Sequence, residues 1–346
     1  HAAMGPHAGA DTETFRTVTA MGAALQRLSP VVGERVTARA VLLYDWPSWW
    51  AASEPGRPTA RLDTVEELAR WHGALWRRGI ATDVAAPGAD LSAYDLILVP
   101  HSYVLTPDAA AGLEAAVARG ATLVVGPYSG VADDRGHILQ GRSPVLLRDT
   151  LGVSGEEWCA LPEGDTRVEV TPQGGAVLGT GDDGRVGDDR GAGAGDATDA
   201  ATILGERLRA DGAEVLATFG EGVLAGLPAL TRHIPATVEG AASAPGTTGA
   251  AWYLGAVMSD GLLDRVIGRA AIEAGVTSPL ADGAAPPNDV EAIRRGSILF
   301  LLHHGEGEAR IGLSSPHHDL LTGTRFEDEA VLRAGDVLAL IEGDHA

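Results

Sequence analysis

Short apolar runs alternate with amphipathic stretches between residues 36 and 125. The apolar runs predict buried strands, and they lie at residues 38–44, 80–84, 95–99 and 121–125. Two amphipathic stretches, residues 63–78 and 106–119, predict helices, because each begins at a capping residue and ends near a glycine. This order of strands and helices predicts an α/β fold with a parallel, doubly wound sheet.

The pattern changes on both sides of this region. Residues 11–28 carry apolar positions at helical spacing and predict one helix. Residues 215–219 and 251–254 predict strands, and residues 261–274 predict a helix. After a Pro- and Gly-rich linker at 278–287, short strands separated by Gly and Asp turns predict a small antiparallel β-domain. We therefore expect three segments, at residues 1–34, 35–277 and 278–346.

Residues 172–200 do not fit either pattern. This stretch is dominated by Gly, Asp and Ala. Such a composition cannot bury much apolar surface, so it predicts a mobile surface loop.

Charge and composition narrow the classes of function. The 346 residues include 26 basic and 47 acidic side chains, a net charge of −21. An acidic chain lacks the basic face that binding to nucleic acid or to an anionic membrane requires. All 26 basic residues are arginine, so no lysine can form a Schiff base. The single cysteine excludes an internal disulfide and a cysteine-built metal centre.

No segment indicates secretion or insertion into a membrane. Residues 1–10 lack the basic and apolar regions of a signal peptide. No run of about 20 apolar residues could span a bilayer. The chain begins with His and not with Met, so we interpret it as a processed or truncated product and expect it in the cytoplasm.

A tryptophan-rich loop follows the first strand, at the sheet edge where ligands of doubly wound folds bind. It contains Trp46, Trp49 and Trp50 but no glycine. Its backbone therefore cannot approach a pyrophosphate, and we expect no dinucleotide cofactor. The three indoles could stack on a sugar ring. We favour the interpretation that they pack in a domain or subunit interface, where tryptophan is enriched.

Two residues are candidate nucleophiles. Ser129 lies in Gly126-Pro127-Tyr128-Ser129-Gly130 after the fourth strand, one position later than the serine of a Gly-x-Ser-x-Gly elbow. Cys159 follows no strand-turn-helix signal, and we interpret it as a small buried apolar residue. A stand-alone hydrolase or amidotransferase-like domain using Ser129 or Cys159 is one alternative function. A carbohydrate-binding module with the tryptophans as its stacking platform is another.

Two histidine pairs, His303–His304 and His317–His318, are the candidate metal ligands. Adjacent residues of a strand point to opposite faces, so neither pair can chelate one ion from a regular strand. A site assembled from both pairs stays open, although no ligand-spacing motif supports it. We interpret the histidines as parts of turns and cross-strand pairs, and expect no metal site.

An ordered set of segments carries a resemblance over nearly the whole chain except the Gly/Asp loop. The segments are residues 1–9, 40–46, 48–50, 90–100, 126–133, 151–153, 161–164, 228–232, 251–255 and 319–323. Together and in this order they resemble the family-42 glycoside hydrolases, the bacterial β-galactosidases.

The resemblance implies a modular enzyme. Its parts would be an N-terminal (β/α)₈ barrel, a flavodoxin-like (class I glutamine-amidotransferase-like) trimerisation domain and a C-terminal β-domain. Residues 1–34 would then hold the tail of the barrel and a connecting helix. The family hydrolyses terminal β-D-galactosides with retention, using two Glu of the barrel. No catalytic residue is therefore assigned to this chain, and it is expected to be inactive alone.

The resemblance also implies partners and one substrate contact. The family's barrel ends in Glu-x-x-His, which holds galactose, and His1 matches that histidine. His1 would bind substrate only in the intact enzyme. The expected partner is the protein itself, as a homotrimer, with the galactoside bound through the barrel. Trp46, Trp49 and Trp50 are the candidates for the interface or for a wall of the active site. We expect this chain to serve homotrimer assembly and to shape the active-site entrance.

Overall fold

The computed structural model of the protein describes residues 5, 7–179, 199–236 and 249–343. The chain divides into two compact units. The larger unit is residues 38–277, and the smaller combines residues 1–37 with residues 278–346. His1 lies outside the described residues, so its expected role stays a prediction.

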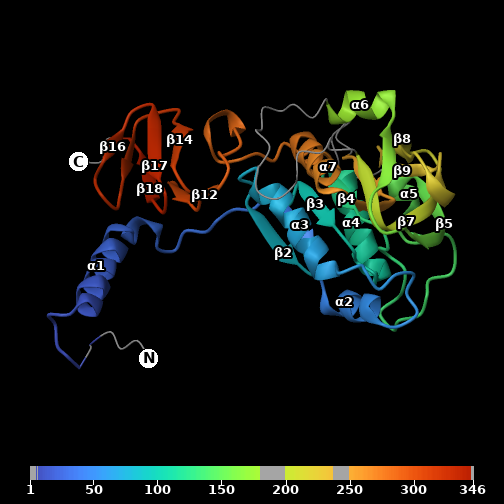
Figure 1. Ribbon diagram of the computed structural model, residues 1–346, viewed down its shortest axis with the longest axis horizontal. Coiled ribbons are helices and arrows are strands. Elements are labelled where there is room, and N and C mark those ends of the chain that lie inside the picture. The colour runs from blue at the N-terminus through green and yellow to red at the C-terminus, as the bar shows by residue number, and fades with distance from the viewer. Residues whose placement is uncertain (1–4, 6, 180–198, 237–248, 344–346) are drawn as a thin grey trace. The chain divides into compact units, whose positions relative to one another are not determined.

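The larger unit is built on an eleven-stranded mixed sheet (Figure 1). Five neighbouring strands run parallel, in the order β2-β1-β3-β4-β10. Their bounds are β1 Ala40–Leu43, β2 Thr82–Ala85, β3 Leu96–Val99, β4 Thr122–Val125 and β10 Ala251–Leu254. All of them except the edge strand β2 are buried along their whole length, as expected of parallel strands covered on both faces.

Helices cover both faces of this parallel part. One row of paired residues, Val41, Ile97, Leu123 and Ala251, packs against α4 (Pro107–Arg119) and α5 (Arg148–Leu151). The adjacent row, Leu42, Leu98, Val124 and Trp252, packs against α3 (Thr64–Trp76) and α7 (Asp260–Glu273). Successive residues of a strand point to opposite faces, so the strand register creates two separate cores.

The other part of the sheet is antiparallel, and here the expectation of a parallel sheet is wrong. Its strands are β5 Val153–Ala160, β6 Thr166–Val170, β7 Ala200–Ala210, β8 Glu214–Phe219, β9 Pro228–His233 and β11 Ala256–Met258. β9 pairs antiparallel with β10, and the order continues through β8, β6 and β7 to β11, while β5 pairs with β7. Only a short turn with one 3₁₀ helix, η2 (Gly222–Leu224), separates β8 from β9. That connection is too short for the crossover that a parallel pair needs.

The described ends of the Gly/Asp-rich stretch at 172–200 are a helix and the start of a strand, not the expected loop. Residues 172–178 form the short helix α6 (Pro172–Leu178), whose N-cap Thr171 accepts a hydrogen bond from the backbone of Gly174. The stretch ends as β7 begins at Ala200. The rest of the expected loop, residues 180–198, lies outside the described residues.

The smaller unit contains the antiparallel β-domain that the strand pattern predicts. One sheet has the order β12-β13-β18-β15-β16, and β14 pairs with β17. The bounds are β12 Val290–Arg295, β13 Ile298–His303, β14 Glu308–Gly312, β15 His317–Asp319, β16 Arg325–Phe326, β17 Glu329–Arg333 and β18 Val337–Glu342. A 3₁₀ helix, η3 (Ala281–Gly283), precedes them. The buried Asp319 carboxylate accepts hydrogen bonds from the backbone of Leu321, Thr322 and Ala339, which explains the Asp-Leu-Leu-Thr-Gly segment as a capped turn.

The smaller unit also contains α1 (Glu13–Arg27), followed by the 3₁₀ helix η1 (Ser29–Val31). Thr12 caps α1 by accepting a hydrogen bond from the backbone of Phe15. None of its residues is buried, and the side chains of Met21 and Leu25 are 54% and 61% exposed. The apolar stripe of α1 is thus uncovered.

No helix among the described residues is long and apolar enough to cross a membrane.

Candidate functional site

The tryptophan-rich segment after β1 is a helix, not the expected loop. Helix α2 spans Trp46–Ser53. The Asp45 carboxylate caps it by accepting a hydrogen bond from the backbone of Ser48 at 3.2 Å, and Pro47 occupies the first turn. An Asp cap followed by Pro is a helix-start signal, and the aromatic composition of the segment obscured it.

Helix α2 is anchored on one side and exposes two indoles on the other. The buried Ser48 hydroxyl accepts a hydrogen bond from the Val104 backbone N–H at 3.0 Å and so ties the helix to the segment after β3. Trp46 and Trp50, four positions apart and therefore on one helix face, are 58% and 59% exposed. Trp49 is half-buried and packs edge-on against Trp46, with ring centroids 5.6 Å apart. A rigid, exposed aromatic face of this kind is suited to docking a protein or stacking on a sugar.

The turn after β4 shares one feature with a nucleophile elbow, a strained central residue, but this residue is a tyrosine and no helix follows it directly. Tyr128 has φ of +63°, a conformation that is rare for bulky residues. Gly126, two residues before Tyr128, allows the backbone to lie close to the carbonyl oxygen of Pro100. A Cβ at position 126 would lie 2.0 Å from that oxygen. Burial raises the pKa of the Tyr128 phenol, so the phenolate that could attack a substrate is disfavoured.

Neither candidate nucleophile is placed for attack. Ser129 is 1% exposed, and its hydroxyl accepts a hydrogen bond from the backbone of Ser102 at 3.2 Å. Cys159 lies on β5, half-buried rather than fully buried as expected, and packs against the core. Burial raises the pKa of its thiol, which lowers the thiolate fraction. The geometry therefore does not support a hydrolase or amidotransferase built on Ser129 or Cys159.

The buried carboxylate of Glu206 lies beside the turn that follows β4. Glu206 on β7 is 1% exposed and accepts hydrogen bonds from the Tyr128 backbone N–H at 2.7 Å, the Trp158 indole at 3.1 Å and the Tyr253 hydroxyl at 2.6 Å. All three donors are uncharged. The hydrogen bonds lower the pKa of Glu206, but burial raises it by more, so the pKa rises from 4.5 to about 7.

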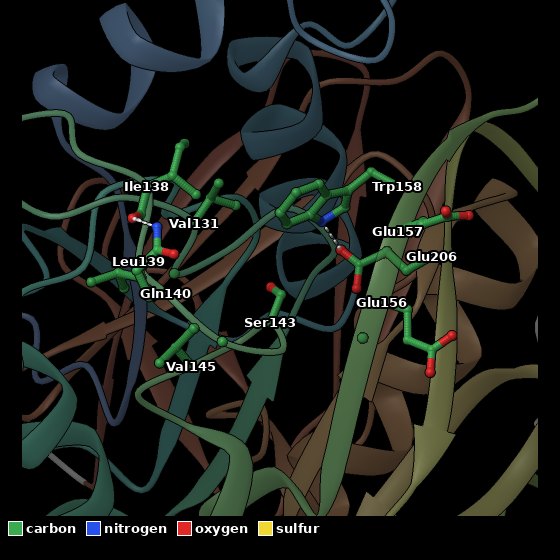
Figure 2. Close-up of a pocket in the computed structure, with 13 residues that line it drawn as sticks. Val131, Ile138, Leu139, Gln140, Ser143, Val145, Glu156, Glu157, Trp158 and Glu206 are labelled. Atoms are coloured by element: carbon green, nitrogen blue, oxygen red, sulfur yellow. Dashed lines mark hydrogen bonds between the residues drawn. The ribbon is translucent and has the colours of Figure 1, made fainter.

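Glu206 borders a cavity of about 230 Å³, shown in Figure 2. Trp158, Ser143 and the apolar residues Val131, Ile138 and Val145 also line it. Glu206 was not predicted as a site residue from the sequence. The only local signal is that it alternates with the apolar residues Leu204 and Leu208, which is the pattern of one strand face, and the structure shows all three residues buried.

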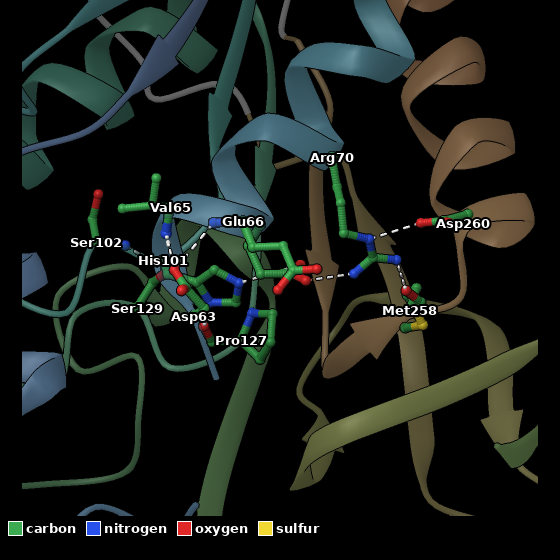
Figure 3. Close-up of polar contacts among 11 residues, drawn as sticks. Asp63, Val65, Glu66, Arg70, His101, Ser102, Pro127, Ser129, Met258 and Asp260 are labelled. Atoms are coloured by element: carbon green, nitrogen blue, oxygen red, sulfur yellow. Dashed lines mark hydrogen bonds and ion pairs between the residues drawn. The ribbon is translucent and has the colours of Figure 1, made fainter. Parts of the chain in front are cut away.

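A second buried carboxylate, Glu67 on α3, belongs to an ion network. Figure 3 labels its partners Arg70 and His101. Its carboxylate pairs with the Arg70 guanidinium and lies 3.6 Å from Nε2 of the buried His101. His101 Nδ1 lies 2.8 Å from the carbonyl oxygen of Pro127, and Arg70 also pairs with Asp260 at 2.7 Å. Burial acts to raise the pKa of Glu67, but His101 and Arg70 outweigh it and hold the pKa below its usual value. The network joins α3 to α7 and to the turns after β3 and β4.

The four histidines of the two pairs lie in the β-domain. His303 and His317 are buried, whereas His304 is half-exposed and pairs with Glu291 at 3.1 Å. His317 Nδ1 lies 2.7 Å from the carbonyl oxygen of Ser315, and His318 Nδ1 lies 2.8 Å from that of Gly343. Within the described ranges, no three His, Cys, Asp or Glu side chains are grouped to hold a metal ion.

Comparisons by family model, by sequence and by structure all match this chain to beta-galactosidases. The family model of the beta-galactosidase trimerisation domain matches residues 38–277. The chain is 35% identical over 347 residues to a beta-galactosidase of Arthrobacter sp., covering 99% of this chain and 44% of that protein. It is 30% identical over 354 residues to beta-galactosidase bgaB of Geobacillus kaustophilus, covering 100% of this chain and 47% of that protein.

A solved structure supports the same likeness. The crystal structure of beta-galactosidase from Bacillus circulans sp. alkalophilus matches with a TM-score of 0.80 at 27% identity, over 99% of this chain and 47% of that one. The chain thus spans about half the length of the relatives it matches. The resemblance to family-42 glycoside hydrolases is confirmed.

Proposed function

Because this chain belongs to the family of beta-galactosidase trimerisation domains, we propose that it is the non-catalytic C-terminal part of a family-42-like β-galactosidase. Its role is to assemble a homotrimer and to shape the entrance of the active site. Hydrolysis of terminal β-D-galactosides with retention then belongs to a barrel that this chain does not contain. The galactoside is bound there, and this chain by itself is inactive. We place the enzyme in the cytoplasm, as expected from the sequence.

The exposed aromatic face of α2 is the observation that carries the assembly role. A cyclic trimer closes through a heterologous interface, in which one surface meets a different surface of the next protomer. Trp46 and Trp50 are solvent-exposed on a helix that Asp45 and Ser48 hold in place. Buried tryptophans at the centre of an interface dominate binding energy. The occupant of this face is therefore a second copy of the protein.

Two further features fit the proposal. The parallel strand order β2-β1-β3-β4-β10 corresponds to the flavodoxin-like order 2-1-3-4-5, which supports a flavodoxin-like description of residues 38–277. The uncovered apolar stripe of α1, with Met21 and Leu25, suits a connecting helix that packs against a barrel. We retain the division at residues 1–34, 35–277 and 278–346 as part of the proposal.

The test uses the full-length enzyme with Trp46→Ala and Trp50→Ala combined. We expect the trimer to dissociate, because interface tryptophans each contribute about 2 kcal/mol or more. Light scattering reports the mass, and galactosidase kinetics report the active-site entrance. Ile272→Ala is the matched control, since Ile272 is 65% exposed on α7, away from α2. A trimer of unchanged mass with unchanged kinetics in the double variant would overturn the assignment of α2.

The exposed indoles also keep the carbohydrate-binding module as a second candidate. A sugar stacked on Trp46 or Trp50 would change the tryptophan fluorescence of this chain. Titration with galactose therefore separates the two roles. A fluorescence change that the double variant abolishes, together with an intact trimer, would favour the module over the interface.

A further inference from the structure

The Glu206 carboxylate holds the turn after β4, residues 126–132, from one side. Its Oε1 accepts hydrogen bonds from the Tyr128 backbone N–H at 2.7 Å and from the Trp158 indole at 3.1 Å (Figure 2). Tyr128 has φ of +63°, and a bulky residue keeps such a conformation only where its surroundings hold it there. Glu206 therefore contributes to the shape of a strained turn.

The same turn is bonded to the segment after β3. The Gly130 N–H donates to the carbonyl oxygen of Ser102 at 2.8 Å, and the Val131 N–H donates to that of Tyr103 at 2.9 Å. The rings of Tyr103 and Tyr128 also pack edge to face, with centroids 5.0 Å apart. A movement of the turn therefore moves this segment.

The segment after β3 in turn anchors helix α2. The Ser48 hydroxyl accepts a hydrogen bond from the Val104 N–H at 3.0 Å and donates one to the Val104 carbonyl oxygen at 3.4 Å. Ser48 is 3% exposed, whereas Trp46 and Trp50 on the same helix are 58% and 59% exposed. A continuous set of hydrogen bonds thus leads from Glu206 to the helix that carries the exposed indoles.

The proton on Glu206 decides how well the first of these contacts is satisfied. Without the proton, Glu206 is a charge 1% exposed whose three hydrogen-bond donors are all uncharged. Burial raises its pKa to about 7, so the folded structure disfavours the ionised form. An opening of the turn that lets water reach the carboxylate relieves this cost.

Several ionisable groups face Glu206 or border the same cavity. They are Tyr128, His101, Tyr253, Cys159, Glu156 and Glu157. Burial raises the pKa of both tyrosines and of the Cys159 thiol, so these groups stay protonated near pH 7. Glu156 and Glu157 pair with arginines on β7. A histidine can change charge near neutral pH, and positively charged His101 lowers the pKa of Glu206, so the experiment has to separate these two residues.

We propose that Glu206 is a proton-dependent positioning residue for helix α2. With its proton bound, the turn after β4 stays closed and holds α2 through residues 102–104. Loss of the proton favours an open turn and a loosened α2. The consequence that self-association weakens above pH 7 rests on the proposed function, whereas the coupling inside the chain does not.

The test is hydrogen exchange of the 346-residue chain at pH 6 and pH 8, read by mass spectrometry and corrected for intrinsic exchange rates. An opening that returns Glu206 from a pKa of about 7 to the ordinary 4.5 is favoured about tenfold more at pH 8 than at pH 6. We expect the protection of residues 46–53, 102–105 and 128–132 to fall by about this factor. Their protection should stay below that of β3, as local opening requires.

Glu206→Gln is the decisive variant. An amide does not titrate, and like the protonated acid it accepts from Tyr128 and can donate to the Tyr253 hydroxyl. It should keep at pH 8 the protection that the parent has at pH 6. His101 is retained in this variant, so a pH dependence that persists comes from other groups and overturns the proposal. Glu157→Gln, at an exposed carboxylate of the same cavity, is the matched control and should respond to pH like the parent.

Ser48→Ala tests the last contact, because it removes the hydroxyl that joins α2 to Val104 and leaves the bonds of Glu206 intact. We expect low protection of residues 46–53 at both pH values, while that of residues 102–105 still falls at pH 8. A pH response of α2 that survives Ser48→Ala overturns the proposal. So does parent protection that is the same at both pH values, or that equals the protection of β3 and thus reports global unfolding.

Discussion

Two buried carboxylates of the larger unit respond to burial in opposite ways. Glu67 has a 5% exposed side chain and lies beside the Arg70 guanidinium and the His101 ring, and its pKa is held below the usual value. Glu206 is 1% exposed and receives hydrogen bonds only from uncharged groups, and its pKa rises to about 7. Burial acts to raise the pKa at both sites. The charge of the partners decides which effect wins.

The difference separates a carboxylate whose charge is compensated by cations from one whose charge is not. The Glu67 carboxylate is compensated by the cations around it, so it ties elements of the fold together. Glu206 receives hydrogen bonds from uncharged donors, which compensate its charge only in part, so its ionised form is disfavoured in the folded protein.

The largest expected effect is at Glu67. Glu67→Gln leaves Arg70 and His101 without their buried counter-charge, and removing one partner of a buried ion pair costs about 3 to 5 kcal/mol. Chemical denaturation followed by tryptophan fluorescence measures the loss. Glu66→Gln on the exposed side of the same helix turn is the control, and we expect a change of about 0.5 kcal/mol or less. Equal effects of the two substitutions would show that the network does not stabilise the fold.

The next effect is a pH dependence due to Glu206. Its folded-state pKa of about 7 lies above the ordinary 4.5, so between these values the folded protein binds more protons than the unfolded chain. Stability is therefore highest below about pH 4.5 for this group and falls as the pH rises to about 7, by roughly 3 kcal/mol in total.

Comparison with Glu206→Gln isolates this contribution, because an amide does not titrate. Unfolding free energies measured from pH 4.5 to pH 8 should fall less steeply in the variant than in the parent. Glu157→Gln is the control, because Glu157 lies on β5, which pairs with β7, and its side chain is 68% exposed. This variant should keep the parent slope. Identical slopes in Glu206→Gln and the parent would contradict the raised pKa.

The smallest of these effects is at a donor to Glu206. Tyr253→Phe removes one of its three hydrogen bonds, and a hydrogen bond to a charged group is worth about 1.5 to 3 kcal/mol. We expect a loss near the lower figure at pH 8 and a smaller loss at pH 5, where Glu206 is protonated. Tyr94→Phe breaks a comparable hydrogen bond to Asp83 in an exposed setting, and denaturation of the two variants at both pH values gives the comparison. A loss that is the same at both pH values would contradict the link to ionised Glu206.

The elements of the parallel part could be predicted because their signals are local. The helix from Thr64 begins at an Asp63 cap, and the buried strands β1, β3 and β4 fall inside the predicted apolar runs. Of the antiparallel strands from β5 to β9, only β8 was predicted. Burial does not alternate along β9, so the period-two signal of a half-buried strand is weak there. Helix α2 was not predicted although Asp45 and Pro47 mark its start, because the aromatic composition of the segment obscured this helix-start signal.

The candidate sites, like the fold, could be predicted from the sequence only in part. The aromatic face was visible as Trp46 and Trp50 in the sequence, but their exposure and the burial of Ser48 between them were not. Ser129 looked like a displaced nucleophile. In the structure Tyr128 occupies the strained position, and Ser129 faces the backbone of Ser102.

Composition and local patterning establish that this is an acidic α/β chain with a small β-domain and a tryptophan-rich segment after its first strand. The order of its segments also predicted its family. The ion network of Glu67 and the cavity of Glu206 came only with the folded chain. Glu67, His101 and Pro127 lie on three segments, and Glu206, Tyr128, Trp158 and Tyr253 lie on four. Strand order brings these groups together, and burial then sets their charge, because both depend on contacts between residues far apart in the chain.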